Sequence, residues 1–399
     1  MNNIIELKKF KEKKLNSPDD NEKCNNNYKA EKKFSGYISD YIKNPDDLIM
    51  EAQKYLQKGL YNEAISLFEG ITKKYPDINE AYYYLAVSYI RKNDLKKAIS
   101  VMTDVLKRCP DDAEIRMLLA ETCIEAGNYK NAIKNIDFML AKNPSDVEAH
   151  NLMGISYMSL GNFRRALGCF KNCKKINRYF LHAYMNSGMC YLNTGNYDFA
   201  ILEFKKTLNI NPDLTESLFN IGYASVLINN FEEGRNCLSK CIISEHKIAQ
   251  CFMLIGYSYI REGLPEKALE HYLKIKNEMK IESSEVLTGI GMSYYYMMDI
   301  ENAKKYLNLA IKSEKSEFLA HYFLGRIFFE KNEFQISADH LRTSLSYEYD
   351  FLDAKILLGD ILYQQGNIEN ALNLWNEAYL KEPYNKEIKN KIDSVDEIN

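Results

Sequence analysis

The sequence lacks any long apolar segment that would direct the chain into or across a membrane. Its first twenty residues, MNNIIELKKFKEKKLNSPDD, contain no apolar stretch of the length that a secretory signal needs. No run of about 18 apolar residues occurs elsewhere, so no bilayer-spanning helix is expected. These absences predict a cytoplasmic protein and give no reason to expect a membrane partner.

Charge of one sign is not in excess either. The 399 residues include 52 basic and 55 acidic side chains, for a formal net charge of −3, so nothing in the charge balance points to nucleic acid as a partner. The nine cysteines come without an export signal, which predicts free thiols in a reducing compartment rather than a disulfide framework.

Motifs of catalysis and metal binding are also missing. The chain has no phosphate-cradling glycine loop, no G-x-S-x-G and no H-E-x-x-H. The pairs Cys169/Cys173 and Cys237/Cys241 have an i, i+4 spacing that could hold a metal, but small apolar thiols at a packing position explain them more simply. The sequence therefore predicts a protein that is not an enzyme, with no catalytic residue, cofactor or metal site.

What the chain does contain is one short pattern repeated ten times. A small residue recurs at a constant interval, with a single interval longer by one residue, and a large apolar residue follows it four positions later. Residues i and i+4 share a helix face, so a neighbouring helix can approach the small residue closely. The small residues are Ala64, Ala98, Ala132, Ala166, Ala200, Gly234, Ala268, Ala303, Ser337 and Ala371; the large ones are Phe68, Met102, Ile136, Phe170, Phe204, Leu238, Tyr272, Leu307, Leu341 and Trp375.

Glycine marks two further positions of the pattern. Twelve residues before each small residue stands a second small one, which is glycine from Gly154 onward and predicts close helix packing. Between the two sites, a turn position usually holds Gly or Asn, the residues that best tolerate the positive φ of a helix end. Proline closes several repeats, as at Pro212. The turn is weakest at Met298, which the pattern does not explain.

A helix–turn–helix unit with a period of about 34 residues and with these small, large and proline positions resembles the tetratricopeptide repeat (TPR). The resemblance covers about residues 45–385 and departs from the family at its first-helix tryptophan, replaced here by residues such as Leu48 and Tyr82. It implies an all-α fold: a right-handed superhelical solenoid of about ten stacked helix–turn–helix units with terminal capping helices, whose first helices line a concave groove.

The same pattern predicts the boundaries of the chain's segments. Residues 1–27 are expected to form a polar, disordered tail, and residues 28–44 and 386–399 to form the N-terminal and C-terminal capping helices. The ten repeats are predicted at 45–78, 79–112, 113–146, 147–180, 181–214, 215–248, 249–282, 284–317, 318–351 and 352–385.

Position 9 of the repeats is the most informative for function. It is polar in the first and last repeats, at Gln53 and Asp360, but unbroken apolar residues occupy it in repeats four to eight. This stripe is open to two interpretations: a ligand groove, or a surface buried by the superhelix itself or by a second copy of the chain. The candidate partner-binding residues lie at positions 5, 6 and 9: Asn151, Met185, Asn186, Met189, Phe219, Asn220, Tyr223, Met253, Tyr257 and Met292.

Some TPR proteins bind acidic chaperone tails through a clamp that needs a basic residue at position 5. No repeat here has one, so the resemblance implies only the broader activity of a non-catalytic scaffold or adaptor that holds a protein or peptide in its groove. The alternative is a regulator whose superhelix changes pitch when a short peptide binds. In either case Tyr223 and Tyr257 are the expected central anchors, and homo-oligomerisation is left open.

Overall fold

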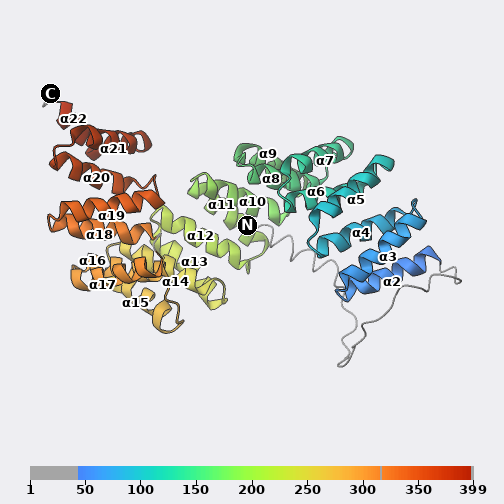
Figure 1. Cartoon of the computed structure of the whole chain (residues 1–399), viewed down its shortest axis with the longest axis horizontal. Coiled ribbons are helices and arrows are strands. Elements are labelled where there is room, and N and C mark those ends of the chain that lie inside the picture. Colours follow the sequence, from blue (N-terminus) through green and yellow to red (C-terminus); the bar gives the residue numbers. More distant parts are fainter. Residues whose placement is uncertain (1–43, 315–316, 397–399) are drawn as a thin grey trace. The chain divides into compact units, whose positions relative to one another are not determined.

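The computed structural model describes residues 44–314 and 317–396, and in these ranges the chain forms α-helices and no strand (Figure 1). Twenty helices form ten consecutive pairs, followed by a single helix, α22 (Lys386–Asp396). The predicted tail 1–27 and nearly all of the predicted capping helix 28–44 lie outside the described residues.

The first helices of the pairs are α2 (Pro45–Gln57), α4 (Asn79–Arg91), α6 (Ala113–Glu125), α8 (Val147–Ser159), α10 (Leu181–Asn193), α12 (Thr215–Leu227), α14 (Ile248–Arg261), α16 (Ser284–Tyr296), α18 (Phe318–Glu330) and α20 (Leu352–Gln364). The second helices are α3 (Tyr61–Lys74), α5 (Leu95–Arg108), α7 (Tyr129–Lys142), α9 (Phe163–Ile176), α11 (Tyr197–Ile210), α13 (Phe231–Ile243), α15 (Pro265–Asn277), α17 (Ile300–Ser313), α19 (Phe334–Tyr347) and α21 (Ile368–Lys381).

The chain divides into two compact bodies, an N-terminal body (Met1–Cys190) and a C-terminal body (Tyr191–Asn399). Within each body the helices pack on those before and after them in the sequence, as α8 does on α7 and α9. First helices also contact the first helix of the next pair, as α14 does with α16 and α16 with α18. This stacking of helical pairs is the arrangement of an α-solenoid and confirms the predicted fold class.

All ten predicted turn positions adopt the left-handed conformation. At Gly195 φ is +72°, and the next N–H, that of Asn196, donates a hydrogen bond of 2.9 Å back to the Tyr191 carbonyl. The residue after the turn often caps the second helix, as Asn162 does by accepting a hydrogen bond from the N–H of Arg165 at 3.2 Å. The recurrent Gly-Asn pair therefore ends one helix and starts the next. Met298 adopts the same conformation, with φ +63°, although its side chain makes this unfavourable.

In the pairs that have a first-helix glycine, the core forms where this glycine meets the large second-helix side chain. A Cβ atom placed on Gly154 would lie 2.4 Å from Cε1 of Phe170, and one on Gly359 would lie 2.4 Å from Nε1 of Trp375. Phe170 is fully buried and Trp375 is 2% exposed. The glycines therefore make room for these rings, which explains why helix-destabilising glycine recurs at this position.

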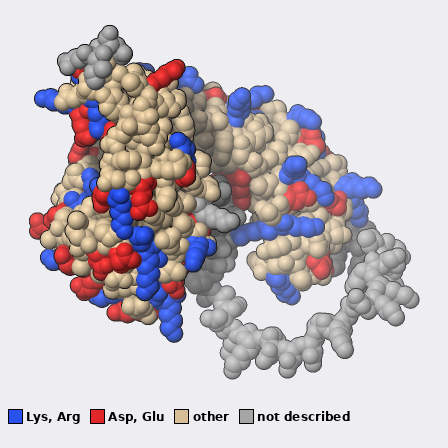
Figure 2. All heavy atoms as spheres, turned by 60° about the vertical axis from the view of Figure 1, so that its left-hand side comes forward, with Lys and Arg blue, Asp and Glu red and all other residues tan. Residues whose placement is uncertain are grey.

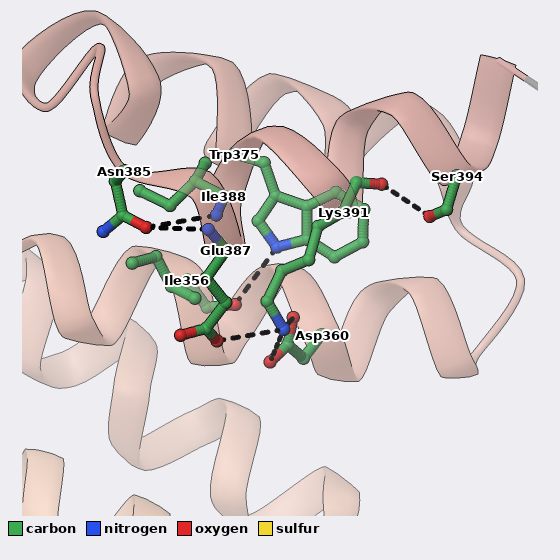
Figure 3. Close-up of polar contacts among 8 residues, drawn as sticks. All are labelled: Ile356, Asp360, Trp375, Asn385, Glu387, Ile388, Lys391 and Ser394. Atoms are coloured by element: carbon green, nitrogen blue, oxygen red, sulfur yellow. Dashed lines mark hydrogen bonds and ion pairs between the residues drawn. The ribbon is translucent and has the colours of Figure 1, made fainter.

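Helix α22 covers the last pair, as Figure 3 shows. Its Ile388 and Val395 are buried, and Asn385 caps its start by accepting hydrogen bonds from the N–H groups of Glu387 and Ile388 at 3.1 and 3.3 Å. Lys391 forms an ion pair of 2.9 Å with Asp360 on α20. Apolar packing and this ion pair together close the apolar end of the solenoid.

None of the helices in the described ranges is long and apolar enough to cross a membrane.

Candidate partner-binding surface

The candidate residues of the N-terminal body lie mostly inside it. The Nδ2 of Asn186 on α10 donates a hydrogen bond of 3.0 Å to Oδ1 of Asn151 on α8, and both side chains are buried. Met185 is buried as well, while Met189 keeps part of its surface accessible. The two amides thus bind one another across adjacent first helices, which leaves fewer of their polar atoms for a ligand.

The candidates of the C-terminal body are more accessible. On α12, Tyr223 is 37% exposed, and on α14 the equivalent Tyr257 is half-buried. Burial raises the pKa of Tyr223, and the nearby hydroxyls of Tyr197 and Tyr257 add to this shift. Met253 on α14 is also half-buried, whereas Met292 on α16 is only 7% exposed. The two tyrosines therefore offer flat apolar surface with polar tips.

Asn220 on α12 has a polar group without a partner. Its side chain is only 6% exposed, yet among the described residues Nδ2 finds no hydrogen-bond acceptor. Buried polar groups are nearly always hydrogen-bonded, and leaving one unpaired costs about 1 to 3 kcal/mol.

Phe219 lies at the edge of this surface, where a neighbouring loop covers it. Glu216 binds His246 Nε2 at 3.0 Å and Lys247 Nζ at 2.8 Å, and the Lys247 ammonium lies 4.2 Å from the centre of the Phe219 ring. Glu245 and Lys247 both have positive φ. The sequence did not indicate this loop, because its contacts join α12 to the start of α14 and follow no repeat position.

Arg261 is a second residue that the sequence pattern missed. It donates hydrogen bonds to the Tyr257 hydroxyl at 3.1 Å and to Oδ1 of Asn229 at 2.9 Å. The guanidinium therefore fixes the polar tip of Tyr257. Its spacing of four residues from Tyr257 on α14 was the available signal.

Two of the cysteines singled out by spacing, Cys173 and Cys241, pack in the core of the structure. Cys173 and Cys241 are fully buried, and their thiols donate to the Val147 and Thr215 carbonyls, each at 3.5 Å. Burial raises the pKa of Cys173 to about 12, so its thiol remains protonated at neutral pH. In the described ranges no cluster of three or more His, Cys, Asp or Glu side chains could hold a metal ion.

Acidic and basic side chains are interspersed over the face of the molecule in Figure 2. No extended field of one sign is seen there, in agreement with the near-neutral balance of the sequence.

Three protein-family models match the chain. Two describe a tetratricopeptide repeat, one at residues 329–386 and the other at 181–214 and 284–317; the third is the model of anaphase-promoting complex, cyclosome, subunit 3, at residues 57–139. The helix pairs define an α-solenoid of repeats. The matches with the two repeat models identify these repeats as tetratricopeptide repeats, and the chain belongs to the tetratricopeptide repeat family.

Among characterised proteins, the chain is similar to tetratricopeptide repeat protein 8 of Caenorhabditis elegans, with 21% identity over 151 residues, which is 37% of this chain and 30% of that protein. It thus spans less than a third of this relative. Similar solved structures include a tetratricopeptide repeat protein from Parabacteroides merdae (18% identity, 62% of this chain and 98% of that chain, TM-score 0.48) and yeast Tom70 (14% identity, 84% and 91%, TM-score 0.43).

Proposed function

We propose that this TPR protein is a non-catalytic scaffold or adaptor that binds a segment of a partner protein along the first helices of its C-terminal body. The 37% exposed ring of Tyr223 carries the proposal, because it lies at position 9 of its repeat, with the equivalent Tyr257 at position 9 of the next one. Asn220 lies one turn before Tyr223, and a peptide carbonyl would accept the hydrogen bond that its buried Nδ2 lacks once the side chain turns outward.

The tyrosines supply the apolar part of the surface. Tyr223 and Tyr257 follow one another at position 9 of adjacent repeats, and Arg261 holds the Tyr257 hydroxyl. Rigid tyrosine rings bury large area at low entropic cost and are enriched among the residues that dominate binding energy. Phe219 and Met253 at position 5 extend this surface on its α12 and α14 sides.

A selection from a library of displayed random peptides on the immobilised full-length chain tests this function. Wild type is expected to enrich a family of peptides, and Tyr223→Ala combined with Tyr257→Ala should weaken their binding by at least about tenfold, measured by fluorescence anisotropy. Tyr384→Ala is the matched control, because Tyr384 is 96% exposed in the loop before α22. If the double variant unfolds by circular dichroism, the tyrosines are core residues and the proposal is wrong.

Asn220 allows a second readout in the same assay. Asn220→Leu removes the unpaired amide, so it should leave the unbound protein at least as stable as wild type while weakening peptide binding by roughly 1 kcal/mol. A loss of stability without a loss of binding would assign the amide to the internal structure instead.

A further inference from the structure

Arg326 on α18 continues the stripe of position 9 beyond Tyr223, Tyr257 and Met292. Its guanidinium carbon lies 5.1 Å from the centre of the Tyr295 ring, 5.8 Å from Tyr322 and 6.0 Å from Phe323. The cation thus lies among three aromatic rings that α16 and α18 provide, within distances at which rings attract a cation.

These rings form a fixed platform. Tyr295, Tyr322 and Phe323 are all buried, and Phe323 packs edge-to-face on Tyr295 at 5.4 Å and on Tyr322 at 5.2 Å. The Tyr295 hydroxyl donates a hydrogen bond to Glu330 one turn beyond Arg326. The position of the guanidinium is therefore set before any ligand arrives.

Arg326 has no ion-pair partner in the part of the chain that the structure describes. Several cations in other repeats of this body are paired: Lys355 with Glu377 at 2.6 Å, Lys391 with Asp360 at 2.9 Å and Arg235 with Glu262 at 2.7 Å. A half-buried guanidinium has lost part of its hydration, and a carboxylate from outside would restore what it lost through two parallel N–H···O bonds.

The surroundings of Arg326 also include negative charge. Burial raises the pKa of Asp353 on α20, and the charges of Arg326 and of Arg261 on α14 oppose that rise. Side chains from α14, α18 and α20 therefore share one electrostatic environment, although their helices belong to different repeats. Burial raises the pKa of Tyr322, and a hydrogen bond from Arg326 opposes that rise, so one donor of the guanidinium is engaged. Glu330 already accepts the Tyr295 hydroxyl, and Asp353 forms no ion pair among the described residues, which leaves the other donors of the guanidinium for a ligand.

We propose that the bound segment carries a carboxylate that pairs with Arg326, at one end of an apolar stretch that lies along Tyr223, Tyr257 and Met292. This inference rests on the proposed function and adds the chemistry of the partner: an apolar segment that ends in an acidic group. The stripe stops at Arg326, because Asp360 at the next repeat is held by Lys391 of α22 (Figure 3).

The peptide selection described above tests the proposal when it is run in parallel on wild type and on Arg326→Gln. Wild type should enrich peptides with Asp, Glu or the free C-terminal carboxylate next to apolar residues, and the variant should enrich apolar peptides without that acidic preference. For one synthetic acidic peptide, Arg326→Gln should weaken binding by about tenfold or more, since bonds to charged groups are the strong ones. A C-terminally amidated copy tells a side-chain carboxylate from the chain terminus.

Two further variants act as controls. Arg326→Lys keeps the charge but loses the planar fork, so it should retain part of the acidic preference. Arg342→Gln removes an exposed arginine of the same repeat that pairs with the exposed Asp339, and it should change nothing. Circular dichroism melting checks that each variant is folded.

The outcomes separate the two proposals. Peptides that depend on Tyr223 and Tyr257 but show no acidic preference, or one that Arg326→Gln leaves intact, would overturn the role of Arg326 and leave the scaffold function standing. If wild type enriches no peptide family at all, the scaffold function itself fails for peptide segments, and the inference fails with it.

Discussion

At the residue scale, the first-helix glycine is required because a ring or a branched side chain of the second helix packs directly against its backbone. Gly154 contacts Phe170, Gly222 contacts Leu238 and Gly359 contacts Trp375, each closer than a Cβ atom would allow. Gly168 in α9 has no such reason, because a Cβ there would meet nothing within 4 Å. The same residue type therefore has opposite consequences at the two positions.

Substitution by alanine should reveal this difference. Gly154→Ala should lower the free energy of unfolding by about 1 to 3 kcal/mol, because the buried Phe170 ring must move. Gly168→Ala should raise it by about 0.5 to 1 kcal/mol, because alanine favours helix. Urea denaturation followed by circular dichroism measures both. Equal stability of the two variants would show that the Phe170 ring moves at little cost.

Residue types alone predicted the turns, but they did not predict which side chains of the candidate site hydrogen-bond to one another. The positive φ of Gly195 follows from glycine, whereas Met298 adopts it only because the helices on either side impose the same turn. Likewise, Tyr223 was expected on an accessible stripe and is 37% exposed, but the mutual hydrogen bond of Asn151 and Asn186 was not expected. Such pairings depend on how adjacent first helices align, which no single repeat encodes.

At the scale of the element, α22 shows how one helix can close a solenoid. Its apolar side chains cover the last pair, while Lys391 reaches the carboxylate of Asp360; the two side chains are 26% and 22% exposed. Burial raises the pKa of Asp360, and the bond to Lys391 opposes that rise. Without Lys391, this carboxylate would remain half-buried and unpaired.

Lys391→Ala should therefore loosen α22 locally. Loss of the pair should cost about 1 to 2 kcal/mol, so hydrogen exchange of the α22 amides should speed up by roughly tenfold at neutral pH. Lys389→Ala, at an exposed residue of the same helix, is the control. Because the pKa of Asp360 is raised, its unpaired carboxylate is charged and destabilises the folded state above that pKa. Below that pKa the carboxyl group is protonated, and the penalty disappears. The difference between the two variants should accordingly shrink in acid, and a pH-independent difference would contradict the ionic explanation.

At the scale of the whole chain, the contacts run mainly between helices adjacent in sequence, so stability should vary along it. A repeat inside the array packs on repeats at both sides, whereas among the described residues the last pair, α20 and α21, is followed by the single helix α22. In such linear arrays each repeat adds its own stability and that of its interfaces, and the all-or-none behaviour of small domains weakens.

The single tryptophan of the chain provides a test. Trp375 is buried in α21 of the last pair, so its fluorescence follows unfolding at that end, while the circular dichroism signal follows all helices. In urea the fluorescence transition should come at a lower concentration than the circular dichroism transition. Lys391→Ala should increase the separation. Transitions that coincide in both proteins would instead indicate a single cooperative unit.

The period of the sequence predicted the helix pairs and their stacking because the same packing contact recurs in every repeat. The candidate surface was less predictable, because it depends on side chains such as Arg261, Lys247 and Arg326 whose partners lie in other helices. Position within a repeat says which way a residue faces. It does not say which charge has been neutralised by a neighbour and which has been left for a ligand.

Helix α22 begins at Lys386, one full repeat period after Leu352, where the last predicted repeat starts, and it lies on α21 as a further first helix would. A copy of residues 352–385 inserted before it would present the same α21 surface to the same closing helix. A repeat could thus be added without changing the contacts of this closing helix. A solenoid closed in this way can be lengthened or shortened by whole repeats, and the extent of surface that it offers to a partner changes in the same steps.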